Sequence, residues 1–222
     1  MRATKTQLEL RQPDLCSVSI VPIETLCYDM LQPKGIIDAV MKWTNTAQHY
    51  GLVAMLFHWL MAIAVVGMFS LGWWMVDLDY YHTWRKDGPD LHRSIGVLLV
   101  FVWALRLAWR IKDVSPQPLA HQGLIAGLAK MMHGLLYLLI PMTGLAGYLI
   151  STADGRGVEV FEWFTVPATF TGIENQEDLA GEVHWYLALA LIVGAGLHGL
   201  AALKHHFIDK DSTLTRMLGI KR

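Results

Sequence analysis

Residues 183–203 have the sequence VHWYLALALIVGAGLHGLAAL, which contains no Asp, Glu, Lys or Arg. A helix that crosses the apolar part of a bilayer needs about 20 mostly apolar residues, so this stretch is long enough to span a membrane. It also contains two histidines, His184 and His198. Ionisable side chains inside a membrane span are costly and usually functional. The stretch therefore predicts a membrane helix and a site that uses imidazole groups.

Three further segments are nearly free of charge, and together with the first they predict the fold. Charged side chains are absent from residues 43–76 and 131–153, and over a shorter stretch from 94–105. The predicted spans lie near Leu52–Val76, Leu91–Trp109, Leu128–Ile150 and Gln176–Leu203. The helices of a soluble bundle would each show a polar face. The expected fold is therefore an all-α, integral membrane four-helix bundle.

Composition supports this interpretation and excludes several protein classes. The chain is 54% hydrophobic and 17% charged, whereas an ordinary soluble domain has roughly 25% charged residues. A net charge of −1 gives no reason to expect a nucleic-acid partner. Two cysteines, Cys16 and Cys27, support neither a disulfide framework nor a zinc site.

The chain is expected to divide into three regions. Residues 1–42 contain Pro13, Pro22 and Pro33 and are predicted to form a poorly ordered N-terminal extension. Residues 43–210 form the transmembrane domain, and residues 211–222 form a C-terminal tail. No apolar run in the extension has the length of a signal peptide.

Orientation follows from the distribution of Lys and Arg around the spans. The two loops 77–90 and 154–182 contain four and seven acidic residues, and few basic ones. The opposite side contains most of the basic residues: Lys42, Arg106, Arg110, Lys112, Lys130, Lys204, Lys210, Arg216, Lys221 and Arg222. Because basic loops stay in the cytoplasm, both termini are predicted to be cytoplasmic and both acidic loops to lie outside.

The histidines of the spans form pairs at matching depths. His184 and His198 are 14 residues apart, and at about 100° per residue this spacing ends about 40° short of four full turns, on one helix face. They are separated by about 21 Å along the axis. The alternating direction of the spans places His58 at the depth of His198, and His92 at the depth of His184.

Two such pairs are typical of a chain that binds two haem b groups between helices, because imidazole nitrogens ligate iron from opposite faces of a haem. We therefore predict His58, His92, His184 and His198 as metal ligands. Fourteen residues after His92 comes Arg106, which is expected near the inner haem and would pair with a propionate. The same step leads from His58 to Gly72 and from His133 to Gly147, where a missing side chain leaves room for a macrocycle. In the alternative, the histidines only hydrogen-bond to other helices.

Other histidines near the inner side each have two candidate roles. His133 is expected to support a ligand or to contact a quinone, and a plain interhelical hydrogen bond is the alternative. His205 and His206 follow Lys204 and are typical of a basic edge at the lipid headgroups. A contact to quinone or to a propionate is their alternative role. No His-Glu-x-x-His motif and no Gly-rich phosphate loop is present.

Several longer motifs resemble those of bacterial cytochromes b561, specifically the YceJ-like branch. They are Phe57-His58-Trp59-Leu60, Leu91-His92-Arg93-Ser94-Ile95-Gly96, Gly147-Tyr148-Leu149-Ile150-Ser151-Thr152-Ala153-Asp154-Gly155, Val183-His184-Trp185, Leu197-His198-Gly199 and Leu203-Lys204-His205-His206-Phe207-Ile208-Asp209-Lys210-Asp211. The resemblance covers residues 43–217. It implies a four-helix protein of the bacterial inner membrane with two non-covalent b haems on His58, His92, His184 and His198, and electron exchange with the quinone pool. One branch resembles a superoxide oxidase that reduces ubiquinone, and YceJ-like proteins are associated with a small periplasmic isoprenoid-binding protein.

The function expected from the sequence is that of a di-haem transmembrane electron carrier of the respiratory chain, which connects quinone to a periplasmic partner. Three alternatives remain open: a superoxide:ubiquinone oxidoreductase, a cytochrome b anchor subunit of a larger redox enzyme, and a haem-free structural or transport bundle. The acidic outer loops disfavour the first, because they would repel an anionic substrate.

Overall fold

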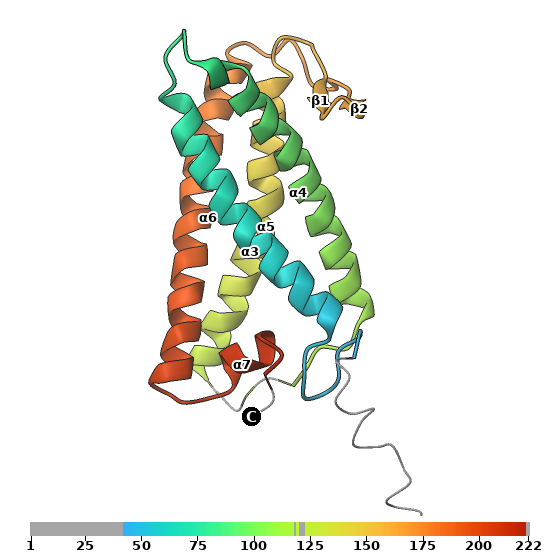
Figure 1. Cartoon of the computed structure of the whole chain (residues 1–222), viewed down its shortest axis with the longest axis vertical. Helices are drawn as coiled ribbons and strands as arrows, with labels where there is room; N and C mark the ends of the chain where they lie inside the picture. Colours follow the sequence, from blue (N-terminus) through green and yellow to red (C-terminus); the bar gives the residue numbers. More distant parts are fainter. Residues whose placement is uncertain (1–41, 118, 120–122, 221–222) are drawn as a thin grey trace, which may run out of the picture. The chain divides into compact units, whose positions relative to one another are not determined.

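The computed structural model describes residues 42–117, 119 and 123–220. These residues belong to a unit that begins at Met41. Apart from Lys42, the predicted N-terminal extension lies outside the described residues. The bundle is built from α3 (Leu52–Val76), α4 (Asp87–Lys112), α5 (Leu124–Ser151) and α6 (Gln176–Phe207) (Figure 1). Within the described part of the chain, these four helices are long and apolar enough to cross a bilayer, as the charge-free segments predict.

The four helices pack around a small apolar core at the middle of the bundle. Helix α5 packs along α6, and α4 packs against both α3 and α5. The buried residues of the core come from α3, α5 and α6, and they are Met61, Val65, Leu139, Ile140 and Leu191. Many other large apolar side chains face outward, such as Ile63 at 70% exposure and Leu200 at 63%. An apolar surface of this extent suits acyl chains and not water.

Short elements distinguish the two ends of the bundle. One end carries η1 (Thr83–Arg85) and the strands β1 (Val158–Val160) and β2 (Phe164–Val166); we call it the hairpin end (Figure 1). The other end carries α7 (Thr213–Met217), and we call it the α7 end. Spans α3 and α5 begin at the α7 end, whereas α4 and α6 begin at the hairpin end.

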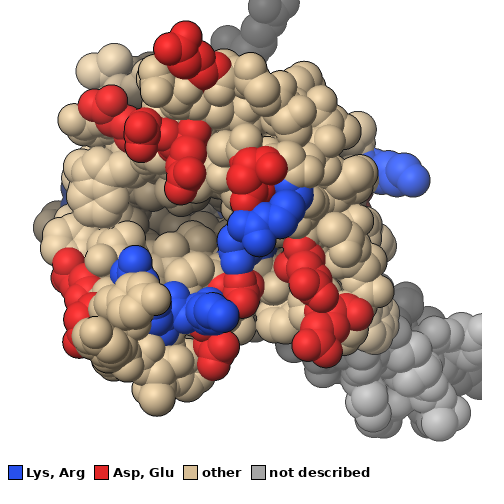
Figure 2. Space-filling model, turned by 90° about the horizontal axis from the view of Figure 1, so that it is seen from above, with Lys and Arg blue, Asp and Glu red and all other residues tan. Residues whose placement is uncertain are grey.

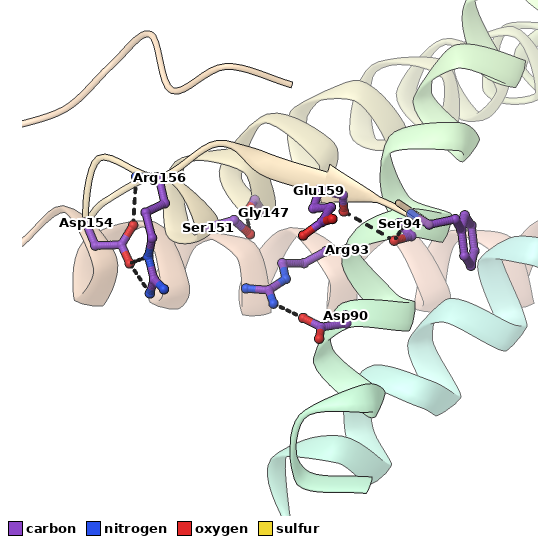
Figure 3. Close-up of polar contacts among 9 residues, drawn as sticks. Asp90, Arg93, Ser94, Gly147, Ser151, Asp154, Arg156 and Glu159 are labelled. Carbon is purple, nitrogen blue, oxygen red and sulfur yellow. Dashed lines mark hydrogen bonds and ion pairs between the residues drawn. The ribbon is translucent and has the colours of Figure 1, made fainter. Parts of the chain in front are cut away.

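The hairpin is the one element that the all-α expectation did not include. Strands β1 and β2 are antiparallel, with Val160 opposite Phe164. Val158 and Val160 are buried and Glu159 between them is exposed, the alternation of a half-buried strand. The buried hydroxyl of Ser94 on α4 donates to the Glu159 carbonyl at 3.4 Å and accepts from the Phe161 amide at 3.2 Å, so the hairpin is fastened to α4 (Figure 3).

Proline inside α5 creates a contact with α4. Pro141 has no amide hydrogen, so the carbonyl of Tyr137 lacks its usual partner four residues later. The indole nitrogen of Trp103 donates to this carbonyl at 3.1 Å. The helix therefore continues through the proline without an unpaired carbonyl.

The predicted C-terminal tail is folded where it is described. The indole nitrogen of Trp59 on α3 donates to the carbonyl of Met217 in α7 at 3.0 Å. In the last turn of α6, His205 has its Nδ1 atom 2.8 Å from a carboxylate oxygen of Asp209 and 3.1 Å from one of Asp211, both in the segment that leads to α7. Lys204 pairs with Asp209 at 2.6 Å, and its ammonium group lowers the pKa of that carboxyl below its ordinary value. These ion pairs hold the turn that brings α7 back to the bundle.

Candidate functional site

His92 of α4 and His184 of α6 face each other near the hairpin end. Their ring centres are 6.1 Å apart, and the ring planes are inclined by 74°. His92 lies in the second turn of α4 and His184 in the third turn of α6, so both are within three helical turns of the hairpin end. Helix direction thus brings together two residues that are far apart in the sequence.

His58 of α3 and His198 of α6 form a second pair nearer the α7 end. Their ring centres are also 6.1 Å apart, at an inclination of 64°. The two pairs are the ones that depth matching predicts. His184 and His198 belong to the same helix, so α6 contributes one member to each pair.

The spacing within each pair suits a metal ion between two imidazole rings. A metal–imidazole bond is about 2 Å long, and the ring centre lies about 1 Å behind the nitrogen, so linear ligation separates two ring centres by about 6 Å. The observed 6.1 Å in both pairs agrees with this value. Both pairs therefore have the spacing that axial ligation of haem iron requires.

A hydrogen bond sets the orientation of His184. Its Nδ1 atom lies 2.9 Å from the carbonyl oxygen of Thr143 on α5. Because a carbonyl only accepts, Nδ1 carries the proton and Nε2 is left with a free lone pair. A histidine that binds a metal characteristically donates its other ring nitrogen in this way.

Two glycines make room for the hairpin-end pair. A Cβ atom on Gly147 would lie 3.1 Å from Cε1 of His184, and a Cβ atom on Gly72 would lie 3.1 Å from Cε1 of His92. Both glycines were predicted at this depth by the 14-residue step. Nδ1 of His92 is buried and finds no hydrogen-bond partner in the residues that the structure describes, whereas Nδ1 of His184 has the Thr143 carbonyl.

Arg106 lies beside the α7-end pair, at the depth that its spacing from His92 predicts. One of its terminal nitrogens is 3.2 Å from Nδ1 of His58, and the other is 3.7 Å from the sulfur of Met61. Its guanidinium group also lies over the ring of Tyr137, 5.2 Å from the ring centre. Sequence analysis did not single out Tyr137; its spacing of four residues from His133 on α5 is the signal that places it nearby.

The remaining predicted site residues are also near the α7 end. The ring of His133 is 5.0 Å from that of His198, so three histidine rings meet there. Farther along α6, His205 is held by Asp209 and Asp211, whereas Nδ1 of His206 is buried and has no hydrogen-bond partner among the described residues. Sequence analysis missed the carbonyl of Thr143, because a backbone acceptor leaves no mark in the side-chain pattern.

The hairpin end is acidic. Figure 2 shows Asp and Glu side chains distributed around this end with fewer basic side chains between them. Two of those basic residues are paired: Arg93 with Asp90, and Arg156 with Asp154 at 2.5 Å (Figure 3). The hydrogen bonds from Arg156 lower the pKa of Asp154 below its ordinary value. Each pair joins one cation to one carboxylate, so the remaining acidic side chains give the end its negative charge.

The geometry agrees with the result of sequence comparison. The family description of prokaryotic cytochrome b561 matches residues 49–219, which include all four long helices, both histidine pairs and α7. The chain belongs to the prokaryotic cytochrome b561 family. Cytochromes b561 are membrane electron carriers with b-type haem, so this chain is a multi-pass bacterial membrane protein of that kind. The family predicted from the motifs is confirmed.

The chain is also similar in sequence to individual bacterial proteins. The chain is 50% identical over 180 residues to cytochrome b561 homolog 2 of Escherichia coli K12, an alignment that covers 81% of this chain and 96% of that protein. It is 29% identical to cytochrome b561 homolog 1 of the same strain, over 72% of this chain and 92% of that protein. It is 28% identical to the probable superoxide oxidase CybB of Yersinia pestis, over 74% of this chain and 93% of that protein.

Proposed function

We propose that this cytochrome b561 carries electrons across the membrane through two b haems, one held by His92 and His184 and the other by His58 and His198. The observation that carries the proposal is the 6.1 Å separation of ring centres in both pairs. When bound, the haem iron supplies reversible one-electron exchange. Two histidines would hold each haem, and such a haem would have no position open for oxygen, which would favour electron transfer.

The residues around the hairpin-end pair orient the ligands. The Thr143 carbonyl fixes the proton of His184 on Nδ1, which leaves Nε2 as the atom that would hold a metal. Gly72 and Gly147 leave room for the two rings, because a Cβ atom at either position would lie 3.1 Å from a ring carbon. His184 is therefore oriented by a hydrogen bond, whereas His92 is held by packing alone among the described residues.

At the α7-end pair, Arg106 donates a hydrogen bond to a histidine ring. A guanidinium group only donates hydrogen bonds, so Nδ1 of His58 accepts in the observed contact and the ring proton lies on Nε2. If Nε2 of His58 were to hold haem iron, Nδ1 would carry the ring proton and could not accept from Arg106, which would then need another acceptor. A haem propionate would be its new acceptor, as the sequence analysis predicts for this residue.

Charge distribution supports an orientation with the α7 end in the cytoplasm and both termini on that side. Quinone exchange, with ubiquinone as the candidate, is then assigned to the α7 end. Residues proposed to contact the quinone or to support that end are His133, Arg106, Lys204, His205 and His206. The hairpin end would face a periplasmic partner, either a redox protein or an isoprenoid-binding protein.

Superoxide:ubiquinone oxidoreductase activity is the second candidate, because the chain is similar to a probable superoxide oxidase. The acidic hairpin end opposes it, since that surface repels an anion approaching His92 and His184. The role of a cytochrome b anchor subunit is a third candidate. Consumption of superoxide by purified protein with ubiquinone would favour the second candidate, and co-purification with a large redox subunit would favour the third.

The deciding experiment is a reduced-minus-oxidised absorbance spectrum of purified protein, combined with a haem-to-protein ratio. We expect a b-type band and two haems per chain. A missing band would refute all redox proposals together and leave the haem-free bundle. A ratio of one would refute the two-haem arrangement and retain a single-haem carrier.

A further inference from the structure

A pocket between α4 and α5 near the α7 end combines positive charge with aromatic rings. It has a volume of about 360 Å³, and its polar lining consists of Arg110 and Trp103 from α4 and Lys130, His133 and Tyr137 from α5. Leu138, which is 57% exposed, borders it. The pocket therefore opens onto the apolar surface that acyl chains cover in a bilayer.

Within the described part of the chain, no carboxylate pairs with the cations of this pocket. Among the described residues, neither Arg110 nor Lys130 takes part in an ion pair. The carboxylate of Asp113, three residues after Arg110, instead accepts from the Asn45 amide at 3.0 Å and from the Trp109 indole at 3.1 Å. An unbalanced pair of cations around one cavity favours an anionic ligand.

Arg110 is also held in place. Its guanidinium carbon lies 5.1 Å from the centre of the Tyr137 ring, which Arg106 approaches at 5.2 Å. Stacking on an aromatic ring restricts the guanidinium group and leaves its N–H groups free to donate. Basic side chains at a membrane edge ordinarily extend to the headgroups one by one. Here two of them converge on a single cavity, whereas Lys204 at the same end is neutralised by Asp209.

We propose that the pocket binds the phosphate group of an anionic membrane phospholipid, with Arg110 and Lys130 as its ligands and the acyl chains along Leu138. Basic pockets between membrane helices recognise such headgroups. The inference rests on the pocket and its cations, and it does not require that the histidine pairs bind haem. A quinone headgroup is the competing occupant because His133 lines the cavity, but a neutral ring has no need of two unbalanced cations.

Native mass spectrometry of the full chain tests the proposal. Wild-type protein is purified from nanodiscs that contain equal amounts of phosphatidylglycerol and phosphatidylcholine, and the lipids retained after detergent release are counted. We expect one retained phosphatidylglycerol per chain. In the double variant Arg110→Gln/Lys130→Gln this retention should fall about tenfold. The matched control Lys42→Gln/Lys112→Gln removes two cations from the same end outside the pocket and should retain the lipid.

Each outcome decides a specific point. Equal retention of the two lipids by wild-type protein, or equal loss in both double variants, would overturn the pocket assignment. Stabilisation by inorganic phosphate alone would support the phosphate site and overturn its assignment to lipid. Displacement of the retained lipid by a ubiquinone analogue in stoichiometric amount would favour the competing occupant. The haem spectrum of the Arg110→Gln/Lys130→Gln variant separates this result from the proposed redox function, since we expect that spectrum to be unchanged.

Discussion

The Cβ atom that Gly147 lacks would lie 3.1 Å from Cε1 of His184, so the glycine provides the space in which this imidazole packs against α5. Four residues earlier on the same face, the Thr143 carbonyl accepts the hydrogen bond from the ring at 2.9 Å. The two residues act together, because a larger side chain at 147 would push the ring away from that carbonyl. One face of α5 therefore sets both the position and the tautomer of the proposed ligand.

Gly147→Val should disrupt the hairpin-end haem and spare the other. The valine side chain occupies the position of the His184 ring, so we expect haem content to fall from two per chain toward one. The measurement is haem per protein by absorbance of the pyridine complex. Gly127→Val is the matched control, because it introduces the same β-branched residue into α5 where a Cβ atom meets nothing within 4 Å. Equal haem loss in both variants would show that helix destabilisation, and not the His184 contact, is the cause.

Direct removal of a ligand gives a related prediction. His184→Ala should remove the hairpin-end haem and leave the haem at His58 and His198, so haem content should fall by about half, because the pairs are about 21 Å apart along α6. His49→Ala, in an exposed loop before α3, should retain both haems. Full haem content in His184→Ala would contradict the ligand assignment.

The sequence is sufficient to predict the four helices, because charged residues are costly within a span and their scarcity marks each helix. The α3 bounds, Leu52–Val76, agree with the predicted span at both ends. The pairing of His92 with His184 also follows from the sequence, since helix rise and alternating direction determine depth. The residues that contact one another between helices at a given depth are harder to predict. The spacing of Tyr137 from His133 places it at this depth, but it does not indicate that the ring contacts both Arg106 and Arg110, because the rotation of each helix depends on packing.

The hairpin illustrates a second limit on sequence-based prediction. Residues 158–166 contain apolar and aromatic side chains that are equally typical of an amphipathic surface segment. The hydroxyl of Ser94 on α4 accepts a hydrogen bond from the Phe161 amide, and this contact holds the hairpin against α4. A contact between residues 67 positions apart decides the local structure here, so a short window of sequence does not contain the necessary information.

Arg106→Gln should lower the redox potential of the α7-end haem selectively. A cation near the haem favours the reduced state, which carries one positive charge less, so its removal shifts the equilibrium toward the oxidised state. We expect a fall of about 60 mV, the shift that corresponds to a tenfold change in a one-electron equilibrium. A spectroelectrochemical titration resolves the two haems. The hairpin-end haem serves as the internal control, and an unchanged α7-end potential would refute the role of Arg106 near that haem.

The hydrogen bond from Trp103 to the Tyr137 carbonyl should stabilise the protein mainly when residue 141 is proline. Trp103→Phe removes the indole donor and leaves the Tyr137 carbonyl unpaired, at a cost of about 1–2 kcal/mol. The apparent Tm in phosphatidylcholine nanodiscs should fall by about 4 °C. In a Pro141→Ala background the alanine amide can bond to the same carbonyl within α5, so Trp103→Phe should then cost clearly less. The four proteins form a double-mutant cycle, which separates the hydrogen bond from the loss of indole volume. Equal destabilisation in the two backgrounds would mean that Trp103 contributes packing alone, and that the carbonyl freed by Pro141 does not need it.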